Sequence, residues 1–477
     1  MTAATAKPIL IGGQWIQTSS AEPVRNPYSN EVLAMVCQAE PEHIHQVTES
    51  VKRVSAECAG IPAHIRAKGL MQIATGLSAR REMFAATICQ EAGKPIMDAR
   101  REVDRAIQTF RLAAEESTRI PGEILPMDLT PGGEAYSGSV KRFPIGTVLG
   151  ITPFNFPLNL VAHKVAPCLA AGNPMVLKPA PQTPLTSLML GEVFLTTELP
   201  PEMLTIIPCS NDLAEQMVIH PNFQALSFTG SMTIGWMLKG KAGYKRVLLE
   251  LGGNAGVIIE PDANLDVAID RCVVGGYGYA GQTCISVQRI FVHESRYDDF
   301  LKAFVDRVRS LPMGDPSLEN TVVGPLINEQ AARRVETWIQ EAVSHGATVM
   351  TGGTRKDSFI EPTVLTHVRT NMKVCCEEIF GPVVTVTPYA DLEEAFALHN
   401  DSDFGLQTGI FTSNIDTMYL AYSRLETGAL LVNEIPTFRA DHMPYGGIKQ
   451  SGLGREGVRY AIQELTEPKL LLVKRSS

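Results

Sequence analysis

The chain contains two long blocks in which apolar positions follow different periods. In residues 41–117, apolar side chains recur every three or four positions, as at Leu70, Ile73 and Leu77, which predicts a mostly helical section. From Gly146 onward, short apolar runs alternate with helical stretches. That alternation is typical of a parallel sheet wound on both faces by helices.

The first alternating block predicts five strands, at residues 147–151, 174–177, 204–207, 225–228 and 247–249. It predicts helices at 158–169, 185–199 and 213–219, with a further helix after Ser231. A second alternation runs from 255 to about 432 and includes predicted helices at 265–274 and 329–344. We therefore expect an α/β fold with two doubly wound parallel sheets.

Three segments fall outside these blocks. Residues 8–15 predict a short hairpin that turns at Gly12-Gly13. Pro121-Gly122 and Pro131-Gly132-Gly133 break the helical pattern, and the segment 121–142 predicts an exposed hairpin arm. The tail, 462–473, ends in a strand-like apolar run that has no partner in its own neighbourhood.

Composition narrows the class of protein. At 477 residues the chain is too long to fold around one hydrophobic core, so two or three subdomains are expected. The net charge of −9 gives no electrostatic reason to expect nucleic acid or an anionic membrane as partner. No uncharged apolar run reaches the length of a membrane span, and residues 1–7 lack the pattern of a signal or transit peptide. We expect a soluble, cytoplasmic protein.

The nine cysteines are scattered through a long chain, which argues against a disulfide framework. The adjacent Cys375-Cys376 pair has no second pair at zinc-ligand spacing, so we expect it to pack and expect no metal site. Cys284, at the end of Gly281-Gln-Thr-Cys, differs because a carboxylate, Glu250, lies one chain segment upstream before two glycines. A thiol and a carboxylate suit covalent catalysis followed by activation of water, although a buried packing cysteine is the simpler alternative.

One motif does not support a function. Residues 276–281 match the Gly-x-Gly-x-x-Gly fingerprint of dinucleotide binding, which works only between a strand and the helix that it feeds. Here the glycines follow a helical pattern and lead into Cys284. The match is a coincidence of composition.

Further polar signals lie where predicted strands end, the edge at which such sheets bind ligands. Asn155 can donate a hydrogen bond to an oxyanion, Lys178 suits a ribose or phosphate, and Gly230-Ser231 opens a helix whose N–H groups suit a pyrophosphate. Glu378 and Phe380 would fit a ribose diol and a flat ring. Taken singly, each has an ordinary alternative: a turn or cap residue, a solvated lysine, a surface turn.

The order of these signals resembles that of the aldehyde dehydrogenase superfamily: Asn155, Lys178, Gly230-Ser231, Glu250, Cys284 and Glu378-Ile-Phe380. The resemblance extends from the N-terminal hairpin to Pro444-Tyr-Gly-Gly-Ile-Lys449 and Ser451-Gly-Leu-Gly-Arg455. It implies attack by the Cys284 thiolate on an aldehyde, with Asn155 and the Cys284 N–H holding the oxyanion. Hydride transfer to NAD or NADP then leaves a thioester, which Glu250-activated water hydrolyses to the acid. Thr152 and Phe154 join the cofactor site by the same resemblance.

The resemblance also implies a division of the chain. It predicts an NAD(P)-binding domain (1–120 and 143–250), a catalytic domain carrying Cys284 (251–432), and a small β oligomerisation element (121–142 and 456–477). Pairing of exposed strands between subunits would cover an open sheet edge, so a homodimer or homotetramer is expected.

Two expectations concern ligands. Many NAD-preferring relatives carry a glutamate three residues after the lysine, where this chain has Pro181, so NADP should be accepted. The substrate should be short and hydroxylated or anionic, because Asn159 and His163 are polar on a helix face expected to line the aldehyde tunnel and because two arginines are candidates for its mouth. The expected substrate residues are Phe156, Asn159, His163, Arg111, Thr283 and Arg439, beside Leu160.

Alternatives remain open at this point. A cysteine thioesterase or esterase would use Cys284 with a base but would not need the nucleotide residues. A broad-range aldehyde dehydrogenase would show no polar preference, and an inactive protein of the same fold could lack Cys284 or Glu250. Arg111 and Arg439 could equally form surface ion pairs, and His163 could be a satisfied core histidine.

Overall fold

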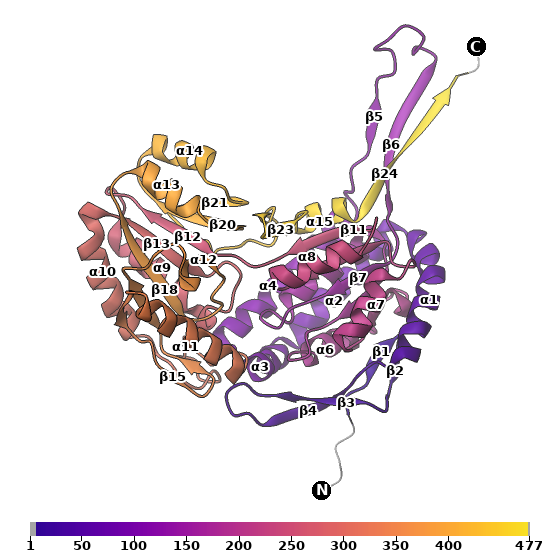
Figure 1. The fold of residues 1–477 in the computed structure, drawn as a ribbon. Helices are drawn as coiled ribbons and strands as arrows, with labels where there is room; N and C mark the ends of the chain where they lie inside the picture. The colour runs from indigo at the N-terminus through magenta and orange to yellow at the C-terminus, as the bar shows by residue number, and fades with distance from the viewer. Residues whose placement is uncertain (1–5, 476–477) are drawn as a thin grey trace.

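The computed structural model describes residues 6–475 of the chain. Two sheets, each covered by helices, lie side by side, and a narrow β arm projects from the body (Figure 1). Within the described residues, no helix combines the length and the apolar character that crossing a bilayer requires. The predicted α/β class is confirmed.

The first sheet has eight strands in the order β2-β1-β9-β8-β7-β10-β11-β23. Its strands are β1 (Ile9–Ile11), β2 (Gln14–Ile16), β7 (Val148–Ile151), β8 (Met175–Lys178), β9 (Leu204–Ile206), β10 (Ala225–Thr229), β11 (Arg246–Glu250) and β23 (Gly452–Leu453). The strands from β9 to β11 are parallel, and antiparallel strands close both edges. The strand order reverses between β7 and β10, where doubly wound sheets bind ligands beyond the carboxyl ends of their strands.

Helices cover both faces of this sheet (Figure 1). They are α1 (Pro41–Ala59), α2 (Ala63–Ala79), α3 (Arg81–Ala92), α4 (Ile96–Glu116), α5 (Asn159–Ala171), α6 (Leu185–Phe194), α7 (Asn211–Ile219), α8 (Met232–Lys241) and α15 (Val458–Glu464). Helices α2 to α6 and α15 share one core that includes Leu70, Phe110 and Leu169. The first half of α1 joins α7 and α8 around Ile44 and Met217 on the other face.

The second sheet has seven strands in the order β14-β17-β18-β13-β12-β20-β21, parallel except for β14. They are β12 (Ala255–Ile259), β13 (Val287–His293), β14 (Thr348–Thr351), β17 (Thr363–Thr366), β18 (Val383–Tyr389), β20 (Gln407–Phe411) and β21 (Ala429–Val432). One face packs against α9 (Leu265–Tyr277), α10 (Glu294–Arg309) and α11 (Glu329–Ser344). The other face packs against α13 (Leu392–Asn400) and α14 (Ile415–Arg424).

The remaining elements are short. They are β3 (Ala21–Arg25) paired with β4 (Val32–Cys37), β15 (Arg355–Lys356) paired with β16 (Phe359–Ile360), β19 (Phe404–Gly405) paired with β22 (Ile448–Lys449), the one-turn helix α12 (Lys373–Cys376), and the 3₁₀ turns η1 (Pro201–Met203) and η2 (Gly278–Gly281).

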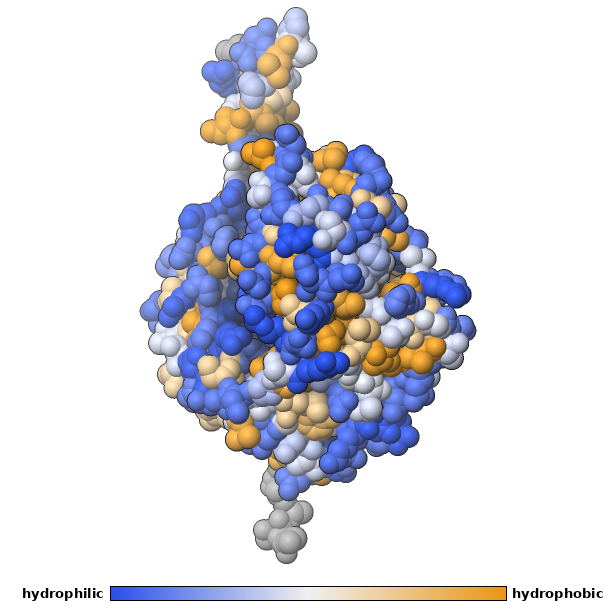
Figure 2. Space-filling model, turned by 90° about the vertical axis from the view of Figure 1, so that its left-hand side faces the viewer, coloured by the Kyte–Doolittle hydropathy of each residue, from blue (hydrophilic) through white to orange (hydrophobic). Residues whose placement is uncertain are grey.

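The arm joins the two segments that the sequence left without partners. Strands β5 (Glu123–Leu125) and β6 (Tyr136–Pro144) form its hairpin, and β24 (Thr466–Lys474) pairs with β6 along its length. Ile124 and Leu471 are among the apolar side chains that remain exposed on it. Figure 2 shows apolar, orange surface on this projecting arm. Self-association through this arm stays a prediction, as does the division into domains. The packing of α15 in the first core leads us to place the start of the tail element at β24 rather than at residue 456.

Candidate active site

A cavity of about 730 Å³ lies at the carboxyl ends of the first sheet's parallel strands, facing the second sheet. Every residue predicted to act in catalysis or cofactor binding lines it: Thr152, Phe154 and Asn155 after β7, Lys178 and Pro181 at and after β8, Gly230 and Ser231 after β10, Glu250 at the end of β11, and Cys284, Glu378 and Phe380 from the second half of the chain. Residues more than 200 positions apart therefore meet at one site, while their roles remain to be tested.

Cys284 follows a tight backbone turn. Tyr279, Ala280 and Gly281 all have left-handed φ values, of 50°, 53° and 71°. This conformation costs non-glycine residues roughly 1–2 kcal/mol each. A Cβ atom on Gly281 would collide with the carbonyl oxygen of Gly381, which explains a glycine there. The turn lies between the end of α9 and β13 and brings Cys284 to the cavity. The glycine-rich segment 276–281 therefore forms the loop that carries the predicted nucleophile.

Glu250 ends β11, and the two glycines after it let the second half of the chain approach. A Cβ atom on Gly253 would collide with the carbonyl oxygen of Cys284. The Gly253 N–H donates to Glu378 Oε1 at 2.9 Å. The Glu250 carboxyl is buried, and its Oε2 has no partner among the described residues. Burial, with repulsion from Glu456, raises the pKa of Glu250 well above its ordinary value, which suits a group that exchanges protons with water.

The thiol of Cys284 is partly exposed and contacts Tyr445, whose hydroxyl lies 3.0 Å from Sγ. Burial raises the pKa of the thiol to about 12, against the opposing effect of this hydrogen bond. Tyr445 belongs to the Pro444-Tyr-Gly-Gly sequence, which by itself predicted no chemistry for the tyrosine. Nothing local marked it as a partner of a cysteine 161 positions away.

Asn155 is held in place by the same loop. Its Nδ2 donates to the carbonyl oxygen of Gln282 at 2.9 Å. An amide nitrogen carries two hydrogens, so one remains available beside the Cys284 loop. This geometry suits the predicted oxyanion donor.

The cofactor end of the cavity offers several features that fit a dinucleotide. Ser231 precedes α8 but its side chain makes no capping bond, so it is not an ordinary cap, and the first-turn N–H groups of α8 remain available to an anion. Lys178 is buried, which lowers its pKa, and its Nζ lies 3.4 Å from Asn211 Oδ1. Burial raises the pKa of Glu378 to about 7. The rings of Phe154 and Phe380 meet edge to face at 5.8 Å.

The predicted substrate residues are placed differently. Leu160 of α5 lines the cavity. The other residues predicted to contact substrate do not line it: Phe156, Asn159, His163, Thr283, Arg111 and Arg439. The reason is that α5 is buried on all sides, so its polar residues face α4 and the segment before β22. Phe156 packs beneath Lys94, whose Nζ is 3.6 Å from the ring centre. The Thr283 hydroxyl accepts a hydrogen bond from the N–H of Ile285.

The protein itself satisfies the two polar residues of α5. His163 Nε2 lies 2.8 Å from Asp441 Oδ1, and Asn159 Nδ2 lies 3.4 Å from the same oxygen. Both side chains have a partner without any substrate, so the prediction that an apolar substrate would leave them unpaired is wrong. Arg111 is exposed on α4 and is not brought to the cavity. Arg105, earlier in that helix, instead reaches Asp441 with a bond of 2.7 Å.

Arg439 is neither a surface residue nor part of the cavity wall. Its side chain is 4% exposed, stacks 3.6 Å from the Tyr445 ring centre and bonds Glu456 at 3.0 Å. Its Nε is buried and has no partner among the described residues. Burial alone would raise the pKa of Glu456, but Lys164 and Arg439 hold it at about 2. No local pattern marked Glu456 or Asp441 as a site residue, because Lys164 and His163, with which they pair, lie far away in the chain.

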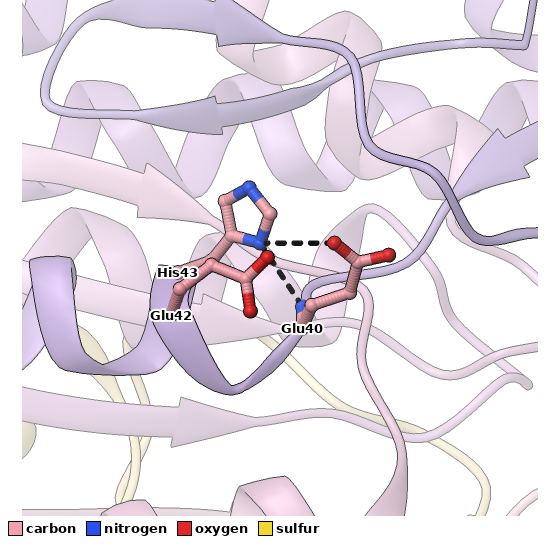
Figure 3. Close-up of side chains that lie close together, drawn as sticks. All are labelled: Glu40, Glu42 and His43. Carbon is pink, nitrogen blue, oxygen red and sulfur yellow. Dashed lines mark hydrogen bonds and ion pairs between the residues drawn. The ribbon is translucent and has the colours of Figure 1, made fainter.

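A separate group of possible metal ligands has a simpler explanation. Among the described residues, Glu40, Glu42 and His43 have side-chain atoms close enough to share an ion (Figure 3). Glu40 and His43 form a reciprocal cap at the start of α1, with the Glu40 N–H 3.1 Å from His43 Nδ1. A helix cap accounts for the arrangement.

Comparison with known proteins gives consistent results. The sequence model of the aldehyde dehydrogenase family matches residues 15–471. The chain is 39% identical to a 3-sulfolactaldehyde dehydrogenase of Priestia aryabhattai over 98% of this chain and 97% of the relative. It is also 39% identical to aspartate-semialdehyde dehydrogenase 1 of Pseudomonas canavaninivorans, over 94% and 95%.

Two solved structures are similar throughout. Aldehyde dehydrogenase 21 of Physcomitrella patens, in complex with the reaction product succinate, has a TM-score of 0.97 and 43% identity over 99% of both chains. The glyceraldehyde-3-phosphate dehydrogenase GapN of Methanocaldococcus jannaschii, complexed with NADP, has a TM-score of 0.92 and 34% identity over 96% of this chain and all of that one.

Proposed function

The chain belongs to the aldehyde dehydrogenase family, whose members use NAD(P), and we propose that it oxidises a short hydroxylated or anionic aldehyde to the carboxylic acid. The observation that carries this proposal is the single cavity that holds Cys284, Glu250 and Asn155 together with the predicted nucleotide residues. A cysteine esterase would need the thiol and a base, but it would not need the predicted nucleotide residues.

The residues at the cofactor end fit NAD(P). The uncapped start of α8 after Ser231 would hold the pyrophosphate, Lys178 and Glu378 would hold the riboses, and Phe380 would lie against a ring. When bound, the nicotinamide accepts the hydride that the substrate carbon loses.

Cys284 is the proposed nucleophile. Its sulfur forms a bond with the aldehyde carbon, and the carbonyl electron pair moves to the oxygen. Asn155 Nδ2 and the Cys284 N–H would donate to that oxygen, and because both are held by the protein they need no reorganisation as charge develops. After hydride loss the acyl group remains on sulfur as a thioester.

Glu250 is the proposed base for the second half of the reaction, the hydrolysis of the thioester. A carboxylate takes a proton from water, and the resulting hydroxide adds to the thioester carbon and releases the acid and the thiol. The unpartnered Oε2 and the raised pKa of Glu250 support this role. The presence of a base for water favours the free acid as product.

One experiment separates the proposed classes. The protein is mixed with a panel of aldehydes and with NAD, NADP or no cofactor, and the reduced cofactor is followed. In parallel assays, hydrolysis of an ester and of a thioester is followed. We expect aldehyde-dependent reduction of cofactor. Ester or thioester turnover alone, without any reduction of NAD or NADP, would identify a cysteine hydrolase instead.

NADP should be accepted. Pro181 lines the cavity and leaves no carboxylate to repel a 2′-phosphate, while Lys178 stands nearby to attract one. We expect Pro181→Glu to lower kcat/KM for NADP about tenfold or more and to change kcat/KM for NAD little. Gln182→Glu, which puts the same charge on the next residue of the wall, should have a smaller effect. A wild-type preference for NAD beyond about a thousandfold, roughly 4 kcal/mol, would contradict this expectation.

The substrate preference now rests on Arg439 rather than on α5. Arg439 belongs to a buried charged cluster in which Lys164 also bonds Glu456 and Arg105 bonds Asp441, with Glu250 as a third carboxylate close by. Arg439 lies behind Tyr445 rather than in the cavity wall, so its guanidinium would favour a carboxylate, sulfonate or phosphate on the substrate from behind that ring. The relatives that act on sulfolactaldehyde and aspartate semialdehyde, and the structure that holds succinate, support a substrate of this kind.

Arg439→Lys tests this role while keeping a positive charge beside Glu456. Lysine cannot stack on the Tyr445 ring as the planar guanidinium does, so its charge lies elsewhere and KM should rise about tenfold or more for a four-carbon aldehyde with a terminal carboxylate. KM for butanal, which has no anionic group, should change much less. Arg111→Lys on the exposed face of α4 is the matched control. Equal losses on both aldehydes, or a wild-type enzyme that prefers hexanal or benzaldehyde, would overturn the anionic assignment.

A further inference from the structure

Tyr445 contacts the reacting atom without belonging to the predicted catalytic set. Among the described residues, its hydroxyl is the one hydrogen-bond partner of Cys284 Sγ, at 3.0 Å. The ring is 2% exposed and packs with Ile285 and Leu406 around the cysteine. A hydroxyl so placed is either a passive spacer or a donor to the nucleophile.

The chemistry of the pair sets the direction of the hydrogen bond. Burial raises the pKa of Tyr445 well above its ordinary value, with further upward shifts from Cys284 and Glu250, so the phenol keeps its proton. When the thiol ionises, sulfur can only accept, and the hydroxyl must donate. The carboxylates of Glu250 and Glu378 oppose ionisation of the thiol, whereas the positive charge of Arg439 favours it. The hydrogen bond from the Tyr445 hydroxyl favours it as well.

The protein holds Tyr445 rigidly. Its backbone exchanges two hydrogen bonds with Glu456, of 2.7 and 3.0 Å, and the Arg439 guanidinium stacks on its ring. The Arg439 side chain is itself fixed by Glu456. A cation over a phenol ring draws electron density from it and strengthens its hydroxyl as a donor.

We propose that Tyr445 is a further catalytic residue, whose hydroxyl positions Cys284 Sγ and donates a hydrogen bond to the thiolate before attack. The thiol proton passes to water in the open cavity, and Tyr445 keeps its own proton throughout. This role deepens the proposed function, on which it rests for its place in the reaction. It can nevertheless be measured without aldehyde or cofactor turnover.

The test is the pH dependence of alkylation of Cys284 by iodoacetamide, a neutral reagent, with the modified residue identified by mass spectrometry. A hydrogen bond to a charged group is strong enough to move this profile by about one pH unit or more. Tyr445→Phe should therefore shift the profile upward by that amount, slow alkylation about tenfold at neutral pH, and converge with wild type at high pH. Tyr277→Phe is the control, because it removes a buried hydroxyl bonded to the Thr363 carbonyl, away from the cavity.

Replacement of Tyr445 by 3,5-difluorotyrosine keeps the shape and makes the hydroxyl more acidic, so it should shift the profile to lower pH. A passive spacer would not produce shifts of opposite sign in the two variants. An unchanged profile in Tyr445→Phe, a uniform slowing at every pH, or an equal shift in Tyr277→Phe would overturn the proposal.

Discussion

Replacing Cys284 with alanine is expected to abolish aldehyde oxidation, with a loss on the order of 10⁴-fold or more. The covalent step needs a sulfur nucleophile, and no other side chain in the cavity can replace it. NAD(P) binding should persist, because the nucleotide residues lie on other strands. Steady-state reduction of cofactor, with binding measured separately, provides the check.

The chain supplies a matched control for this substitution. Of the nine cysteines, only Cys284 and Cys376 are not buried. Cys376→Ala removes the other partly exposed thiol and should leave turnover unchanged. Alkylation of Cys284 alone should inactivate the wild-type enzyme. Retention of more than a few per cent of wild-type turnover by Cys284→Ala, as a rough bound, would show that the nucleophile lies elsewhere.

Glu250→Gln is expected to block release of the acid far more than hydride transfer, because only the water step requires a base. The expected result is a burst of reduced cofactor close to the enzyme concentration, followed by turnover reduced about 10²–10⁴-fold. Stopped-flow absorbance resolves the two phases. Hydroxylamine attacks a thioester without a base, so it should restore turnover in this variant.

The pH dependence of the wild-type enzyme follows from the same group. Glu250 acts as a base only after it loses its proton, and its pKa lies well above the ordinary glutamate value. Deacylation should therefore rise with pH, and its loss on acidification should begin above the usual glutamate range. Glu250→Gln should lack this dependence. Loss of the burst together with the steady state would mean that Glu250 activates the thiol instead.

The parts of the fold that depend on neighbouring residues were predictable. Apolar runs bounded by turn residues predicted all five parallel strands of the first sheet, and the three- and four-residue period predicted the helical section. One helix was overextended: the segment predicted at 185–199 is helical only to Phe194, after which Pro200 and Pro201 begin a new turn. The motifs that end at strand termini were predictable for the same local reason.

Only the tertiary structure decided which polar groups meet. The tail strand pairs with β6 residues that lie 322 to 338 positions earlier, from Thr466 with Pro144 to Lys474 with Tyr136, and Asp441 pairs with His163 across 278 positions. No local pattern encodes such pairings, because an ion pair depends on where whole elements pack.

The pattern of apolar and turn residues was thus enough to predict the α/β class and the arm, whereas the resemblance of the ordered motifs to a known family predicted the cysteine, glutamate and asparagine that share one cavity. The tertiary structure decided that α5 is buried on all sides, that Arg439 stacks behind Tyr445, and that Tyr445 contacts the thiol. These features depend on how elements that are distant in the chain pack against one another, and that packing is a property of the folded chain.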